Sequence, residues 1–276
     1  MFSLNCKGKL LLIEKPLVMG ILNITGDSFY AGSRLKNLEA IKNKAAQMIM
    51  EGADIIDIGA QSTRPGSERI SADKELEKLL PAIEMLMGLF PEIIISIDTY
   101  HSKVAKETVE AGAAIINDIS AGEMDKNMLA TVGSLNAPYI AMHMKGVPET
   151  MHLQTNYEDA IKEILDFFIK KIAECKRAGI KDVIVDPGFG FGKNIKQNLL
   201  LLKNLSVFQM LEKPILAGLS RKSTIYKTLK ITAEESLNGT TVLNTLALQN
   251  GASILRVHDV KEAKEVVAMM EAYKKS

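Results

Sequence analysis

The 276-residue sequence has no tryptophan, only two cysteines and almost no net charge. Aromatic residues make up 5% of the chain and the formal net charge is +1, so neither a base-stacking platform nor a basic face for nucleic acid is expected. Cys6 and Cys175 lie far apart and form no C-x-x-C motif, which argues against a disulfide framework and a thiolate metal site. This cysteine usage indicates a reduced, cytoplasmic setting.

Long apolar segments are also missing. No run reaches the length of a membrane span, and the run 10–13 near the N-terminus stops at Glu14, too short for the core of a signal peptide. The overall composition, 47% apolar and 24% charged, is typical of globular proteins. We therefore expect one globular domain over residues 1–276.

What the sequence does contain is a regular alternation of short apolar runs and longer helical segments. Eight strands are predicted, at 17–22, 53–58, 93–97, 114–116, 138–142, 183–185, 215–217 and 253–257. Eight helices follow them, at 37–51, 72–90, 102–111, 126–135, 157–178, 195–210, 233–249 and 260–274.

Eight strand–helix units in this length indicate an α/β fold of the (β/α)₈ or TIM-barrel type. A doubly wound sheet is the alternative, but the G-x-G-x-x-G expected after its first strand is missing. Before the first unit, residues 4–10 with Gly8 at the turn predict a β-hairpin, which we place as a cap on the bottom of the barrel.

Polar residues come directly after each predicted strand, where ligands bind in parallel α/β folds. Barrel closure would bring these strand ends together at one mouth. In chain order the set is Asn23, Asp27 and Ser28; the segment 59–66; Asp98; Asn117 and Asp118; His143 and Lys145; Asp186; Ser220, Arg221, Lys222 and Ser223; and Arg256, His258 and Asp259.

The chemistry of this set favours two kinds of ligand. Carboxylate and amide groups on Asp98, Asn117 and Asp186 suit a planar, nitrogen-rich ring. Positive charge for an anion is expected from Arg64, Lys222, Arg256 and His258. Asn23, together with Asp27, offers oxygen ligands for Mg²⁺. No nucleophile–base triad stands out, so the mouth is suited to hold a heterocycle and a phosphate-type leaving group.

Each of these residues also has a purely structural explanation. Asp98 could cap the next helix, Asn117 and Asp118 could form a turn, Arg256 could pair with Asp259 on the surface, and Lys222 could be solvated. Their shared position at strand ends favours the functional interpretation.

The segment 188–193 is glycine-rich but does not predict a P-loop. Pro187 stands where the first glycine is needed, and Asn194 stands in the place of Ser or Thr. We expect Phe189 and Phe191 to be one core residue and one wall of the pocket.

Seven segments are more specific together than any is alone: MGILNITGDSF (19–29), DIGAQSTRPG (57–66), ISIDT (95–99), INDIS (116–120), DPGFGFGK (186–193), GLSRKS (218–223) and RVHDV (256–260). Over residues 17–260 the chain resembles dihydropteroate synthase, the folate-biosynthesis family targeted by sulfonamides. The resemblance implies a pterin-binding transferase that condenses (7,8-dihydropterin-6-yl)methyl diphosphate with 4-aminobenzoate, uses Mg²⁺ and forms a homodimer.

The resemblance also implies roles for individual residues. The catalytic set would be Asp98, Asp186, Lys222 and Arg256, and Asn23 would be the Mg²⁺ ligand. The pterin diphosphate would be bound by Thr63, Asp98, Asn117, Asp186, Lys222, Arg256 and His258, and 4-aminobenzoate by Ser223, Arg64, Pro65 and Phe191. The chain departs from the family pattern at Gly26, where Pro is usual, and at Gln61, where Glu is usual.

Three other functions stay open at this point. A methyltetrahydrofolate-dependent methyltransferase shares the pterin-binding barrel but needs no diphosphate site. A catalytically inactive pterin-binding homologue would accommodate the changes at Gly26 and Gln61. A phosphate-binding barrel for another metabolite gives no reason for the set of Asp98, Asn117 and Asp186.

Overall fold

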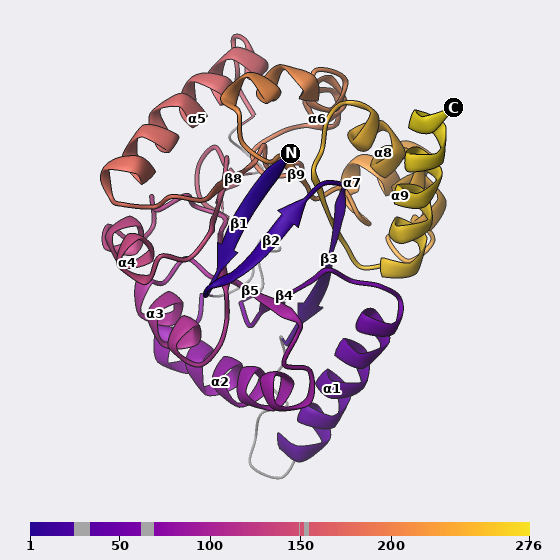
Figure 1. Ribbon diagram of the computed structural model, residues 1–276. Coiled ribbons are helices and arrows are strands. Elements are labelled where there is room, and N and C mark those ends of the chain that lie inside the picture. The colour runs from indigo at the N-terminus through magenta and orange to yellow at the C-terminus, as the bar shows by residue number, and fades with distance from the viewer. Residues whose placement is uncertain (25–33, 62–68, 149, 152–154) are drawn as a thin grey trace.

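The computed structural model describes residues 1–24, 34–61, 69–148, 150–151 and 155–276. Eight parallel strands form one sheet in the order β8-β7-β6-β5-β4-β3-β10-β9, and a backbone bridge between Val185 and Ile215 joins its two edges. The predicted (β/α)₈ barrel is therefore confirmed (Figure 1). The strands are β3 (Leu17–Asn23), β4 (Ile55–Gly59), β5 (Ile94–Asp98), β6 (Ile115–Asp118), β7 (Tyr139–Met142), β8 (Val183–Asp186), β9 (Leu216–Ala217) and β10 (Ile254–Val257).

Helices surround the strands as an outer ring (Figure 1). They are buried against the barrel through large apolar side chains, such as Leu79 and Ile83 of α2 and Phe168 of α5. The helices are α1 (Arg34–Met50), α2 (Ala72–Leu89), α3 (Ser102–Glu110), α4 (Met128–Leu135), α5 (Ala160–Arg177), α6 (Ile195–Lys203), α7 (Ser223–Leu229), α8 (Leu237–Gln249) and α9 (Val260–Lys275).

Two predicted helices differ most from the structure at their ends, while the ends of the others agree to within three residues. The helix expected over 195–210 is divided into α6 and a 3₁₀ helix, η3 (Leu205–Leu211), because Asn204 leaves the helical conformation and donates its side-chain N–H to Leu200 O over 2.8 Å. The helix expected from 233 begins later, since the hydroxyl of Ser236 bonds Ala233 O in a turn before α8. Both errors arise from polar side chains that compete for backbone groups.

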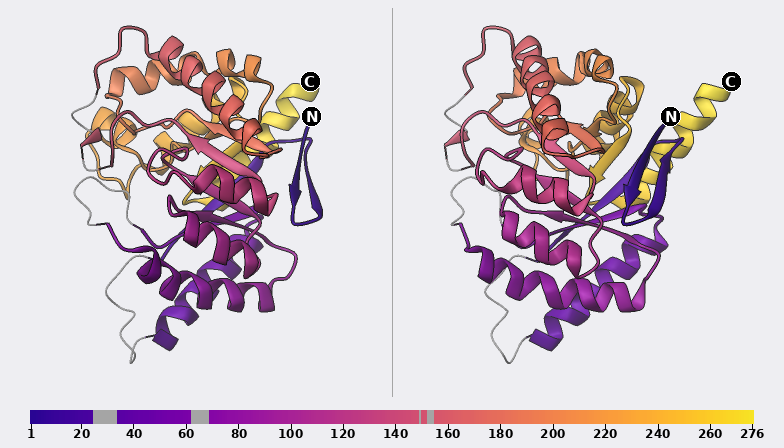
Figure 2. Two further views of the ribbon diagram at one scale, coloured as in Figure 1. Left: turned by 90° about the vertical axis from the view of Figure 1, so that its left-hand side faces the viewer. Right: turned by 60° about the vertical axis from the view of Figure 1, so that its left-hand side comes forward.

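The N-terminal hairpin is formed by β1 (Phe2–Cys6) and β2 (Lys9–Ile13). Its turn uses positive φ at both Lys7 and Gly8, which fits the twist of a two-residue hairpin loop. On its inner face Leu4, Cys6 and Ile13 are buried against the apolar ends of the barrel strands. Figure 2 shows the hairpin lying across one end of the barrel, as expected for a cap.

No helix in the described part of the chain is both long and apolar enough to cross a lipid bilayer.

Candidate active site

In several strands, the residues that face the barrel interior are apolar near the amino end and polar two positions later. Ile55, Ile115, Ile184 and Ile254 belong to the apolar cluster under the hairpin. Two positions further along the same strands lie Asp57, Asn117, Asp186 and Arg256. Since side chains two residues apart point to the same face of a strand, the polar set lies in the barrel interior at its carboxyl end.

Asp57 and Arg256 join Asn117 and Asp98 in one hydrogen-bonded network that spans four strands, β4, β5, β6 and β10. Asp57 Oδ2 accepts from Arg256 Nε over 2.6 Å and from Asn117 Nδ2 over 3.0 Å. Arg256 Nη2 donates to Asp98 Oδ2 over 2.7 Å. The structure therefore brings Asp98, Asn117 and Arg256 together, and the alternative pairing of Arg256 with Asp259 is wrong.

Sequence reasoning missed Asp57, which organises this network. Its side chain is 0% exposed, and both of its partners meet at one carboxylate oxygen. A signal was present in the sequence, because Asp57 is a charged residue inside the apolar run of β4 and begins the segment 57–66. A charge is costly to bury unless it is paired, so that position could have been flagged.

Burial and neighbouring charges shift the protonation of Asp98. Burial raises the pKa of Asp98 to about 7, with Arg256 opposing the shift and Asp57 adding to it. Burial lowers the pKa of Arg256, but Asp57 and Asp98 outweigh it, so the pKa lies above the usual value and the guanidinium stays charged. Asp98 does not cap α3, because Asp125 Oδ2 accepts the hydrogen bond from Ser102 N over 2.7 Å.

A second pair of charged side chains, Asp186 and Lys222, lies at the end of β8 and in the segment after β9. Asp186 Oδ1 accepts from Gly188 N over 2.8 Å, while the Lys222 ammonium donates to Phe189 O and lies 4.7 Å from the centroid of the Phe191 ring. Burial raises the pKa of Asp186 against the attraction of Lys222, and burial lowers the pKa of Lys222 to about 8. Lys222 is thus held in the site and not freely solvated.

One of the two phenylalanines of this loop is a core residue, as predicted, and the role of the other as a pocket wall stays a prediction. Phe189 is 1% exposed and belongs to the main core, whereas Phe191 packs on an upper cluster formed by Tyr100, Ile119 and Met142.

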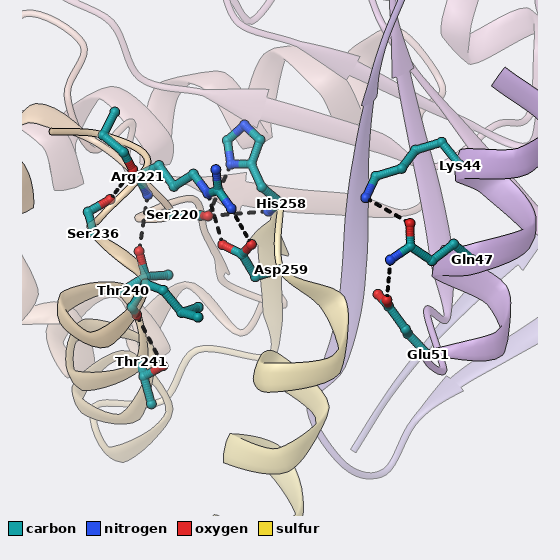
Figure 3. A network of polar contacts seen from close by, with 12 residues as sticks. Lys44, Gln47, Glu51, Ser220, Arg221, Ser236, Thr240, Thr241, His258 and Asp259 are labelled. Carbon is teal, nitrogen blue, oxygen red and sulfur yellow. Dashed lines mark hydrogen bonds and ion pairs between the residues drawn. The ribbon is translucent and has the colours of Figure 1, made fainter. Parts of the chain in front are cut away.

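His258 lies at the mouth beside a polar network from the loop after β9 (Figure 3). Its Nδ1 lies 3.0 Å from the hydroxyl of Ser220, and Arg221 pairs with Asp259 at the start of α9. Burial, with the nearby Arg256 and Arg221, lowers the pKa of His258 to about 4. The His258 ring is therefore neutral near pH 7 and acts as a hydrogen-bonding group, and its contact with an anion stays a prediction.

The structure describes only some of the remaining predicted contacts. Ser223 is the first residue of α7, directly after Lys222. Thr63, Arg64 and Pro65 lie outside the described residues, as do Asp27 and Ser28. Gly26 also lies outside them, whereas Gln61 is described: it is buried and its Oε1 accepts from Ile70 N over 2.8 Å. A glutamate oxygen could accept the same bond.

Asn23 is exposed at the end of β3, beside Gly59 at the end of β4. A β-carbon built on Gly59 would lie 3.7 Å from Asn23 Oδ1 and 3.3 Å from Asp98 Cβ, so the glycine leaves room between these two oxygen-bearing side chains. Among the described residues no three His, Cys, Asp or Glu side chains cluster as a metal site. A single amide oxygen fits Mg²⁺ when substrate oxygens and water complete the shell.

The sequence model of a family described as pterin binding enzyme matches residues 19–258. The curated dihydropteroate synthase of Escherichia coli strain K12 is 41% identical over 98% of this chain and 96% of its own length. The Bacillus subtilis enzyme of the same name is 40% identical over 94% of this chain and 89% of its own length. The chain belongs to the dihydropteroate synthase family.

Solved structures of this family agree with the fold over its full length. The Yersinia pestis dihydropteroate synthase in complex with a sulfonamide drug superposes with a TM-score of 0.93 at 38% identity, covering 100% of both chains. The Xanthomonas albilineans enzyme in complex with 7,8-dihydropteroate gives 0.87 at 32% identity, covering 99% of both. The predicted family, barrel fold and transferase function are confirmed.

Proposed function

We propose that the chain condenses (7,8-dihydropterin-6-yl)methyl diphosphate with 4-aminobenzoate at the mouth of the barrel, giving 7,8-dihydropteroate and diphosphate. The observation that carries this proposal is the network of Asp57, Asp98, Asn117 and Arg256 beside the pair of Asp186 and Lys222. It offers hydrogen-bond acceptors for a nitrogen-rich ring within reach of fixed positive charge. Membership of the family supports the same reaction.

In this proposal the pterin ring lies among Asp98, Asn117, Asp186 and Lys222. The carboxylates accept from ring and amino N–H groups, and Lys222 donates to a ring oxygen or nitrogen. As the bond between the methylene carbon and the diphosphate oxygen breaks, positive charge develops on the carbon and spreads into the ring. Ionised Asp98 and Asp186 stabilise that charge, because they are fixed in a poorly solvated site.

The leaving diphosphate is stabilised by Arg256, with His258 and Thr63 as hydrogen-bonding groups. Arg256 uses Nε and Nη2 for Asp57 and Asp98, so its orientation is fixed before substrate binds. Asn23 would hold Mg²⁺, which when bound supplies positive charge to the diphosphate oxygens.

The amine of 4-aminobenzoate forms the new C–N bond and then loses a proton. An aromatic amine is a sufficient nucleophile when it is well placed, so positioning replaces a general base. We assign Ser223, Arg64, Pro65 and Phe191 to this substrate. The place of Ser223 next to Lys222, and of the Phe191 ring 4.7 Å from the Lys222 ammonium, supports adjacent pockets for the two substrates.

We also propose that the chain works as a cytoplasmic homodimer of one domain each. Both cysteines are free and buried, which suits a reduced compartment. Val242 and Leu246 of α8 are 51% and 44% exposed, and Met269 and Tyr273 of α9 are 71% and 66% exposed. These helices lie side by side (Figure 1), so the apolar residues supply material for a common face.

Sedimentation of the wild type and the double variant Val242→Glu, Met269→Glu tests the dimer. A dimeric wild type and a folded monomeric variant would support this face. A dimer that persists in the variant would exclude it.

The reaction is tested by diphosphate release from the dihydropterin diphosphate with Mg²⁺ and 4-aminobenzoate. Release should require 4-aminobenzoate and should be lost in Asp186→Asn and Lys222→Ala. If the pterin binds by calorimetry but the wild type releases no diphosphate, the proposal is wrong, and a methyltransferase or an inactive pterin binder becomes the better explanation.

A further inference from the structure

Lys193 is a buried lysine to which the proposed reaction assigns no role. It is 7% exposed, and its ammonium nitrogen lies 2.9 Å from Gly188 O, 3.0 Å from Phe191 O, 3.0 Å from His143 Nδ1 and 3.3 Å from His143 O. An ammonium group has three N–H donors for these four acceptors, whereas a neutral amine has two. The surroundings therefore match the charged form of Lys193.

A second buried lysine shows what is unusual about this one. Lys171 on α5 has a side chain that is 5% exposed, and it pairs with Glu123 at 2.6 Å and Glu174 at 2.7 Å. The four acceptors around Lys193 are all uncharged, so among the described residues no direct ion pair offsets the cost of burying its charge. Such a position calls for an explanation beyond stability.

Two of the four acceptors of Lys193 belong to the loop 188–191, which follows Asp186 and also contacts Lys222. Gly188 donates its backbone N–H to Asp186, and its backbone carbonyl accepts from Lys193. Phe191 presents its carbonyl to Lys193 and its ring to Lys222. The short loop 188–191 is thus held between two ammonium groups.

Gly188 shows how tightly this loop is seated. It has φ of +72°, and a β-carbon there would lie 1.9 Å from His143 O. The ends of β7 and β8 are therefore in direct contact below the loop, and Lys193 bonds to both sides of that contact.

We propose that Lys193 is a positioning residue of the pterin site, whose buried ammonium group fixes the loop 188–191 so that Gly188 N–H reaches Asp186 and Phe189 O reaches Lys222. This inference rests on the assignment of Asp186 and Lys222 to the pterin pocket. Lys193 acts through the loop and through its charge, without touching substrate.

The charge of Lys193 also acts on Asp186. The titratable and charged groups around Lys193 are Asp186 on β8, Lys222 after β9, and His143 and Lys145 after β7. His143 is uncharged, since burial lowers its pKa to about 2, and burial lowers the pKa of Lys193 to about 7. Lys193, like Lys222, opposes the rise in the pKa of Asp186 that burial causes. Removing it should make Asp186 take up a proton at higher pH.

The test compares Lys193→Met with Lys171→Met, which also removes one buried ammonium group but lies on α5, outside the site. Binding of 6-hydroxymethylpterin, an unreactive pterin, is measured by calorimetry from pH 5 to 9, and turnover of the dihydropterin diphosphate is measured alongside. In Lys193→Met we expect pterin affinity to fall on the order of tenfold at pH 6, where Lys193 of the wild type is charged, with the acid limb of the binding profile moved to higher pH. Lys171→Met should keep the wild-type affinity and profile.

Several outcomes would overturn the inference. Folded Lys193→Met with wild-type pterin affinity and an unmoved acid limb shows that Lys193 is structural only. An equal loss in both variants shows a general effect of destabilisation. If Lys193→Met does not fold, Lys193→Gln is used in the same assay, and wild-type binding in it also overturns the inference. If the wild type shows no turnover of the dihydropterin diphosphate, the proposed reaction is rejected instead.

Discussion

The two ends of the barrel are built from the same strands but from different chemistry. At the amino end Ile55 and Ile254 are buried with Leu4 of the hairpin, and the interior is apolar. At the carboxyl end, Asp57 and Arg256 on those strands form a buried ion pair. Two residues along the same strand therefore separate a side chain that stabilises the fold from a side chain that belongs to the candidate active site. Substitutions at matched positions can separate the two functions.

Asp57→Asn should have the largest effect. It keeps the shape of the side chain but removes the charge that holds Arg256 and Asn117. Since a misdirected or unpaired charge at a transition state is costly, we expect kcat/KM to fall on the order of 10²–10³-fold. Steady-state kinetics measure this, with circular dichroism to show that the variant is folded. Wild-type kcat/KM would show that Asp57 does not orient the network.

Ile55→Ala, at the other end of β4, should behave in the opposite way. Ile55 is 0% exposed and packs in the cluster beneath the hairpin. Its truncation should lower the free energy of unfolding by about 3 kcal/mol, through lost burial and an internal cavity. Urea titration measures the loss, and kcat per folded molecule should match the wild type. A large fall in kcat with little loss of stability would remove the distinction between the two ends.

Glu75→Gln sharpens the comparison, because it tests charge burial just outside the barrel mouth. Glu75 lies in the first turn of α2, and burial raises its pKa to about 8, with Thr99 opposing the shift and Asp98 adding to it. The folded state thus binds the Glu75 proton more tightly than the unfolded chain, so this contribution to stability is complete at low pH and is lost as pH rises through about 8.

From pH 7 to 9 the wild type should therefore lose about 1 kcal/mol more stability than Glu75→Gln. Urea titrations at several pH values measure the difference between the two slopes. Parallel slopes would show that Glu75 is already ionised at pH 7.

Lys264→Met should have the smallest effect. Lys264 pairs with Asp54, just before β4, and the two side chains are 25% and 24% exposed. Solvent screens such a pair, so the loss of stability should be less than about 1 kcal/mol. Thermal unfolding at low and high salt measures it. A loss as large as that expected for Ile55→Ala would show that solvent does not screen the pair of Lys264 and Asp54, despite its partial exposure.

The order of elements could be read from the sequence because each strand is a short apolar run that ends in polar residues. Helix ends were less well predicted where Asn204 and Ser236 bond to nearby carbonyls. In the site, the strand-end residues Asp98, Asn117 and Arg256 were found because they follow or end the runs. No role was predicted for Asp57, which lies within a strand, or for Lys193, the last residue of a glycine-rich segment in which only the phenylalanines were interpreted.

The protonation of the site could not be read from the sequence either. The neutral state of His258 depends on burial and on Arg256 and Arg221, which are brought to it by the fold. A residue type shows which charge is available, but three-dimensional surroundings decide whether it is carried.

The barrel is closed between β8 and β9 by few backbone contacts, and we call this boundary the β8–β9 seam. Between β8 and β9 the backbone is joined by the bridge from Val185 to Ile215, with Val185 N bonded to Pro214 O over 3.0 Å, and β9 is two residues long. Amide hydrogens at this seam should exchange with solvent sooner than those between β3 and β4, since fewer neighbours must open together. Asp186 and Lys222 lie on opposite sides of the seam, so a pterin bound to both side chains would connect the two strands across it. Bound substrate would then slow local opening of the barrel between β8 and β9, where the fewest backbone hydrogen bonds close it.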